Sequence, residues 1–294
     1  MSKNNLALLA AFTATTIYAL NHTIAKVVMP KFIEPLGFVQ LRIIGAAILF
    51  WIVSFFITKD KIKIKDFKKI FLATCIGMFI NMIAYIKGLS LTTPINAGLI
   101  STLTPLFVLI LSYIFLKENI TTKKVIGISL GFFGAIILVI MGDNYTKNAP
   151  NPFFGNILLL INCLCYGSFL IVIKNLLAKY HFVNLVKWMF TIGIFLNLPF
   201  GYDQLMSVEW KKIPFDGFWR ICFVVIGTTF FTYLLNIYAL KRLSPTKVVI
   251  FAYMQPIIAI IYAVVSENDK LDLVKVISCI VILSGVYLVT QKTR

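Results

Sequence analysis

Long apolar runs separated by short polar segments cover almost all of this 294-residue chain. Most runs are close to the roughly 20 residues that an α-helix needs to cross a bilayer core of about 30 Å. The runs do not alternate apolar and polar residues as the strands of a membrane β-barrel do. Because lipid offers no hydrogen-bond partner to a bare backbone, the pattern predicts membrane-spanning helices.

The runs divide into ten predicted spans, five in each half of the chain. The first five are Leu6–Val28, Pro35–Ile57, Ile70–Leu89, Pro94–Leu116 and Val125–Met141. The second five are Phe153–Ile173, Phe182–Phe200, Phe218–Ala239, Pro245–Val265 and Leu273–Val289. The predicted fold class is an all-α integral membrane protein with ten transmembrane helices.

The two halves repeat one another at a nearly constant spacing. Pro105 and Pro256 lie 151 residues apart, and Tyr18 and Tyr166 lie 148 apart. Since five spans is an odd number, the second copy starts on the opposite side of the membrane. Inverted repeats of this kind are typical of secondary transporters. The predicted repeats are residues 1–141 and 153–290. Further pairs at these spacings are Pro94 with Pro245, Lys26 with Lys174, Glu118 with Asp269 and Gly134 with Gly285.

Positive charge is concentrated on one side of the predicted topology. The formal net charge is +17. When each lysine and arginine is assigned to its nearest loop or terminus, with only Arg42 left out as intramembrane, 18 lie on the side of the termini and nine on the other. This asymmetry predicts cytoplasmic N- and C-termini. It also explains the basic composition without a nucleic-acid partner, and we predict none. The densest cluster, between Lys59 and Lys69, could also touch anionic lipid of the bilayer.

Several short sequences resemble the EamA family of the drug/metabolite transporter superfamily. They are Tyr18-Ala19 with Lys26, Leu41-Arg42, Phe115-Leu116-Lys117-Glu118, and Leu243-Ser244-Pro245-Thr246 followed by Pro256-Ile257. One departure lies after the ninth span, where Ser266-Glu267-Asn268-Asp269 replaces the family's usual Leu-Gly-Glu. The resemblance implies a multi-pass carrier of a bacterial inner membrane that moves amino acids, other metabolites or toxic compounds, usually outward.

Polar residues inside the spans are candidates for substrate contacts, because they are costly in lipid. Asn81 and Tyr85 lie on one stripe of the third span with Gly77 and Gly88. Shifting that stripe by 151 residues gives Thr228, Thr232, Asn236 and Ala239 in the eighth span. We expect the two stripes to form opposing walls of a central cavity. The alternative is that these residues only form hydrogen bonds between helices.

The two midspan prolines form a second candidate feature. Pro105 and Pro256 each follow a polar residue, Thr104 and Gln255 respectively. A proline removes a helical hydrogen bond and kinks the helix, which exposes a carbonyl. Such a kink near the midplane can serve binding or gating, or it can serve packing alone.

Two charged or titratable residues lie in the first and second spans. His22 shares a face with Thr15, Tyr18 and Lys26, where it could take up a proton or stay neutral and hydrogen-bonded. Arg42 could bind a substrate carboxylate, although we favour a role in capping carbonyls.

No acidic residue lies within the predicted spans. Coupling to protons or sodium through an intramembrane carboxylate is therefore not expected. The fixed charges there are positive, which favours zwitterionic or anionic substrates. The five cysteines also lie in spans and are interpreted as packing residues. The glycines of the fifth span, Gly127, Gly131 and Gly134, are interpreted as an internal packing surface or a homodimer contact.

The repeat pattern predicts a secondary transporter that works by alternating access, and the family resemblance implies that it lies in the inner membrane and exports small polar metabolites such as amino acids. Alternatives are a drug-efflux carrier, a membrane-embedded enzyme and a channel. No catalytic residue, metal or cofactor is predicted. The predicted gating residues are Pro105 and Pro256. The predicted substrate-binding residues are His22, Asn81, Tyr85, Thr104, Tyr166, Thr232, Asn236 and Gln255.

Overall fold

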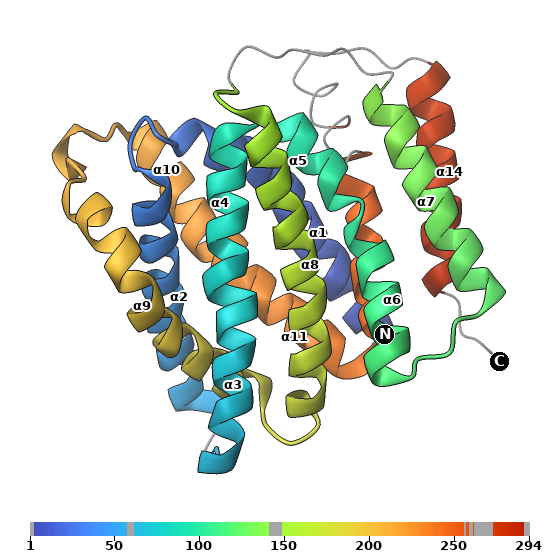
Figure 1. The fold of residues 1–294 in the computed structure, drawn as a ribbon, viewed down its shortest axis with the longest axis horizontal. Coiled ribbons are helices and arrows are strands. Elements are labelled where there is room, and N and C mark those ends of the chain that lie inside the picture. Colours follow the sequence, from blue (N-terminus) through green and yellow to red (C-terminus); the bar gives the residue numbers. More distant parts are fainter. Residues whose placement is uncertain are drawn as a thin grey trace.

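The computed structural model describes residues 3–57, 62–140, 149–255, 257–258, 261 and 273–290. Over these residues the chain is a bundle of helices, and the described part contains no β-strand (Figure 1). The all-helical fold is confirmed. Within the described residues, five helical stretches are long and apolar enough to cross a membrane: Pro35–Ile57, Ile64–Leu91, Pro152–Leu177, Phe182–Met206 and Phe215–Arg242. Shorter apolar helices are Thr104–Leu116 and Val276–Val289.

Among the described residues, the elements of the two halves follow the same order as far as α5 and α12. In the first half they are α1 (Lys3–Val28), α2 (Pro35–Ile57), η1 (Ile64–Asp66), α3 (Phe67–Thr74), η2 (Cys75–Ile80), α4 (Asn81–Leu91), α5 (Pro94–Ser101), α6 (Thr104–Leu116) and α7 (Thr122–Ile140). In the second half they are α8 (Pro152–Leu177), α9 (Phe182–Met206), η3 (Trp210–Lys212), α10 (Phe215–Cys222), η4 (Phe223–Phe231), α11 (Thr232–Arg242), α12 (Pro245–Val249), η5 (Ile250–Tyr253) and α14 (Leu273–Thr290).

The most extensive helix contacts join one half of the chain to the other. The pairs are α2 with α9, α7 with α14, α4 with α8, and α1 with α11. At the spacing of the sequence repeat, α1 corresponds to α8 and α4 to α11. The contact between α1 and α11 is therefore the repeat equivalent of the contact between α8 and α4. In each of the other two pairs, α2 with α9 and α7 with α14, a helix packs against its own repeat equivalent.

Glycines let two of these helix pairs approach closely. A Cβ atom placed at Gly88 of α4 lies 3.0 Å from the carbonyl oxygen of Gly155 in α8. One placed at Gly285 of α14 lies 2.5 Å from the carbonyl oxygen of Gly127 in α7. Small residues serve such backbone contacts in membrane bundles, where apolar side chains gain little by leaving lipid. The glycines of the fifth span thus pack inside the molecule.

The third and eighth spans each contain a π-helical segment in the middle. In η2 and η4 the helix continues without a break, but its hydrogen-bond ladder is widened. Residues 75–80 of η2 shifted by 151 become 226–231, which lie within η4. π segments are rare and are frequent at functional sites. Nothing in the hydrophobic pattern predicts them.

The fourth span is interrupted before its proline. Helix α5 ends at Ser101, and α6 begins at Thr104 with Pro105 in its first turn. Between them the Leu103 amide donates to the carbonyl of Ile100 at 3.0 Å, in a tighter turn. The ninth span changes to the 3-10 helix η5 at residues 250–253, which correspond to residues 99–102 at the spacing of 151 and so overlap the start of this interruption. Pro256 lies outside the described residues.

Two helices extend further than the predicted spans and bring carboxylates into helical structure. Helix α9 continues to Met206 and so includes Asp203, while Asp216 lies in the first turn of α10. Both carboxylates lie near helix ends, where side chains can reach the polar edge of a membrane.

Candidate functional site

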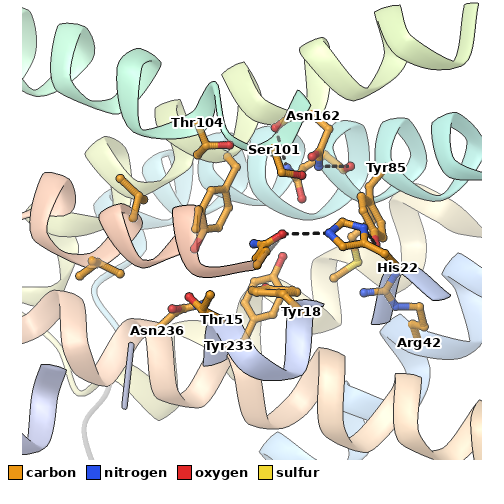
Figure 2. Close-up of a pocket in the computed structure, with 17 residues that line it drawn as sticks. Thr15, Tyr18, His22, Arg42, Tyr85, Ser101, Thr104, Asn162, Tyr233 and Asn236 are labelled. Atoms are coloured by element: carbon orange, nitrogen blue, oxygen red, sulfur yellow. Dashed lines mark hydrogen bonds between the residues drawn. The ribbon is translucent and has the colours of Figure 1, made fainter. Parts of the chain in front are cut away.

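A polar cavity lies at the centre of the bundle, where helices of both halves meet. Its volume is about 100 Å³. Figure 2 shows side chains from several helices pointing into it. Its polar lining residues are Thr15, Tyr18, His22, Arg42, Asn81, Tyr85, Ser101, Thr104, Asn162, Tyr166, Tyr233, Asn236 and Gln255. Its apolar lining residues are Met82, Val248, Val249 and Ala252.

Seven of the eight residues predicted to bind substrate line this cavity. They are His22, Asn81, Tyr85, Thr104, Tyr166, Asn236 and Gln255. The eighth, Thr232, is buried behind the lining beside Tyr18, and its hydroxyl donates to the carbonyl of Thr228 one turn earlier in its own helix. A threonine side chain is short enough to be satisfied this way. The asparagine at the equivalent position, Asn81, is longer and reaches the neighbouring helix.

Three polar lining residues, Asn162, Ser101 and Tyr233, were not considered as candidates in the sequence. Asn162 is an amide in the middle of α8, and the cost of burying an amide in lipid is a signal that points to it. Ser101 is a weaker signal of the same kind, because burying a single hydroxyl in lipid costs less than burying an amide. Tyr233 lies beside the predicted stripe of the eighth span rather than on it, so its spacing carried no signal.

A chain of hydrogen bonds crosses the cavity from α1 to α4 and to the segment after η5. Asn21 Nδ2 donates to the Tyr85 hydroxyl at 2.9 Å. The Tyr85 hydroxyl lies 3.1 Å from His22 Nδ1, and His22 Nε2 lies 2.9 Å from Gln255 Oε1. With Nε2 protonated, the imidazole donates to Gln255 and accepts from Tyr85 (Figure 2). This arrangement fits a neutral, hydrogen-bonded histidine.

Two asparagines join α4 to α8 at the cavity wall. Asn81 Nδ2 donates to the carbonyl of Asn162 at 3.0 Å, and Asn162 Nδ2 donates to the carbonyl of Asn81 at 3.1 Å. Asn81 therefore forms an interhelical bond as well as lining the cavity. The two interpretations of this residue given by the sequence do not exclude one another.

A lysine binds the C-terminal end of the third span, which lies beside the cavity helices. Lys26 Nζ of α1 donates to the carbonyls of Leu89, Ser90 and Thr92, each at 2.9 Å. The last carbonyls of a helix have no partner within the helix and carry partial negative charge. Lys26 thus fixes the end of α4 to α1.

The second half makes the same contact. Lys174 Nζ of α8 donates to the carbonyl of Leu243 at 2.7 Å and to that of Leu240. Lys174 follows Lys26 by 148 residues, while Leu240 follows Leu89 by 151. These are the two spacings of the sequence repeat, so the repeat extends to individual hydrogen bonds.

The described residues include no group of three or more His, Cys, Asp or Glu side chains placed to hold a metal ion. The absence of a cofactor stays a prediction.

Comparison with known proteins adds the family. The model of the EamA-like transporter family matches residues 5–140 and 153–291. The chain belongs to the EamA-like transporter family. It is a multi-pass membrane protein of the transporter type, and the names of its relatives indicate transport rather than catalysis.

Relatives of this EamA-family chain occur in archaea, bacteria and plants. An uncharacterized transporter of Archaeoglobus fulgidus is 28% identical over 98% of both chains. The uncharacterized transporter YyaM of Bacillus subtilis is 23% identical over 72% of this chain and 69% of its own. A WAT1-related protein of Arabidopsis thaliana is 23% identical over 94% and 83%, respectively. A crystal structure of a protein 15% identical to this chain covers 96% of this chain and 95% of its own with a TM-score of 0.77, which shows a shared fold.

Proposed function

We propose that this EamA-family protein is a secondary transporter of the inner membrane that exports small polar metabolites, such as amino acids, by alternating access. The observation that carries the proposal is the polar cavity shared by both halves. A water molecule needs about 10–15 Å³ measured in this way, and the cavity has about 100 Å³. A molecule of amino-acid size matches that space better than a bulky drug does, which disfavours the drug-efflux alternative.

The proposed architecture is ten spans in two inverted repeats, residues 1–141 and 153–290. Three findings favour it: the exchangeable helix pairs, the π segments at matching positions, and the two lysines on matching carbonyls. Two halves of opposite orientation around one site can open in turn to either side.

The proposed orientation has both termini in the cytoplasm. Figure 1 draws the start of α1, the start of α3 and the loop between α6 and α7 toward the same end of the bundle. These segments belong to the side that carries the excess of lysine and arginine.

The proposed substrate contacts are the cavity residues named above. The interruption before Pro105 and the 3-10 helix before Pro256 lie next to Thr104 and Gln255, both of which line the cavity. We assign these two interruptions to gating, because a broken helix can bend with little loss of hydrogen bonding.

Counterflow in proteoliposomes tests the carrier function. Purified protein is first screened by thermal shift against amino acids, nucleosides, sugar phosphates and drugs. Proteoliposomes are then loaded with the stabilising solute, and uptake of a radiolabelled trace of it is followed. A carrier shows uptake stimulated by the internal solute. A channel shows no such stimulation, and an enzyme releases a chemically altered product.

A further inference from the structure

Arg42 is a buried cation at the cavity with an incomplete set of hydrogen-bond partners. It lies in α2, its side chain lines the cavity and the residue is only 3% exposed. Its Nε donates to Thr229 Oγ1 at 2.9 Å. Its Nη1 is buried and has no hydrogen-bond partner among the described residues. Figure 2 draws Arg42 at the same edge of the cavity as His22 and Tyr85, and Tyr85 is near enough to interact with its charge.

The contact with Thr229 fixes the direction of the guanidinium. Thr229 lies in the π segment η4, and its hydroxyl donates to the carbonyl of Val224 at 2.8 Å. Its oxygen is therefore oriented to accept from Arg42. This anchors the Nε edge, so the other nitrogens of the planar group are held in place beside the cavity.

The charge of Arg42 has no counter-ion among the described residues. The ion pairs found there involve other cations: Lys124, Lys179, Lys212 and Arg220. The groups near enough to interact with the Arg42 charge include Tyr18, Tyr85 and Tyr233, which are neutral phenols. A guanidinium does not lose its proton in proteins, and an uncompensated buried charge is strongly unfavourable.

We propose that Arg42 is the anion-binding centre of the cavity and that the transported solute carries a carboxylate which pairs with its guanidinium. This inference rests on the carrier function proposed above. A carboxylate suits the site because the guanidinium presents several N–H donors in one plane, and one or two of them can bind its oxygens. The sequence favoured a capping role for Arg42, but the contact found is to a hydroxyl rather than to carbonyls.

The first test compares matched solutes on the parent protein. Lactate, leucine, phenylalanine and glutamine are compared with lactamide, leucinamide, phenylalaninamide and glutamine amide, in low-chloride buffer, by titrated thermal stability. We expect at least one carboxylate to bind about tenfold or more tightly than its amide, the size of a lost charged contact. Equal binding of every pair overturns the proposal. Stabilisation by chloride but by no carboxylate also overturns it, because Arg42 is then a site for an inorganic anion only.

The second test changes the arginine. Arg42→Gln should abolish the preference for the carboxylate, and Arg42→Lys should keep the charge but reduce the preference, because lysine lacks the planar fork. The matched control is Arg220→Gln in α10, which removes a surface pair with Asp216 and should leave the preference unchanged. If Arg42→Gln does not fold, the carboxylate preference of Arg42→Lys is the measurement that tests the proposal. A preference in that variant equal to the parent's overturns the proposal.

The outcomes separate this inference from the carrier function. Counterflow of neutral solutes by the parent, with no preference for carboxylates, leaves the carrier in place and overturns the anion site. Loss of counterflow for every solute in the screen contradicts the carrier function itself.

Discussion

At the scale of single residues, a substitution of Asn236 tests whether the cavity lining binds solute. It is buried in α11 and lines the cavity, as Asn81 of α4 does. Replacing it with leucine keeps a similar size and removes a hydrogen-bonding group. A polar solute then leaves a desolvated group unpaired, which costs about 1–3 kcal/mol.

Asn236→Leu should therefore weaken solute binding by about five- to 150-fold, at about 1.4 kcal/mol per factor of ten. The measurement is direct binding to purified protein, because a transport rate also depends on gating. Lys63→Ala, an exposed residue outside the cavity, is the control and should bind as the parent does. Parent-like binding by Asn236→Leu would show that this amide only serves packing.

The candidate residues were largely predictable because lipid penalises unpaired polar groups, so each buried Asn, His or Gln in a span is informative. Side-chain reach was not predictable. Thr232 occupies the position equivalent to Asn81, yet its hydroxyl bonds within its own helix. Tyr233, its neighbour, lines the cavity and donates to the carbonyl of Gly77 at 2.8 Å. That bond depends on the π segment η2, where Gly77 lies, and the sequence pattern does not reveal that segment.

At the scale of helices, the lysine contacts at the ends of α4 and α11 offer a paired test. Lys26→Met and Lys174→Met remove a charged donor from two or three carbonyls but keep an unbranched apolar stem. Hydrogen bonds to charged groups contribute about 1.5–3 kcal/mol, so each variant should lower the free energy of unfolding by about that amount. Lys68→Met, on the exposed surface of α3, should leave it unchanged. Denaturant titration in detergent measures all three, and unaltered stability in both Lys26→Met and Lys174→Met would contradict a stabilising role for these hydrogen bonds.

The interruption between α5 and α6 should matter for movement more than for folding. Pro105→Ala restores a backbone N–H and lets the helix continue through residues 102–103. We expect solute binding within about twofold of the parent, and transport reduced by about tenfold or more, a barrier change of about 1.4 kcal/mol. Counterflow and binding are measured on the same preparation. A parent-like rate in the folded variant would mean that the break only shapes packing.

Hydropathy predicted where most helices begin and end, because a bilayer of fixed thickness dictates their length. It did not predict what happens inside them. The π segments η2 and η4 and the break at residues 102–103 change backbone hydrogen bonding without changing hydrophobicity. Of these irregularities, only the break at residues 102–103 was indicated by the sequence, through Pro105.

At the scale of the whole molecule, the inverted repeat makes a prediction about sidedness. Lys63 lies in the connection after α2, and Lys211 lies 148 residues later, in the connection after α9. Both are exposed. Equivalent positions of inverted halves face opposite sides of the membrane.

In a cysteine-free background, Lys211→Cys should react with a membrane-impermeant thiol reagent added to intact cells. Lys63→Cys should react only after permeabilisation. Reaction of both positions from the same side would contradict inversion, and reaction of Lys63→Cys from outside would contradict the proposed orientation of the termini.

The central claim is that one cavity, shared by two inverted halves, opens in turn to each side of the membrane. A single cysteine in its wall measures this directly. Ser101→Cys at the end of α5 is a small change at a lining position, made in the same cysteine-free background. We expect an impermeant thiol reagent to label it from either face of oriented vesicles, with both rates shifting when solute is added. Labelling from one face only, whatever solute is present, would contradict alternating access.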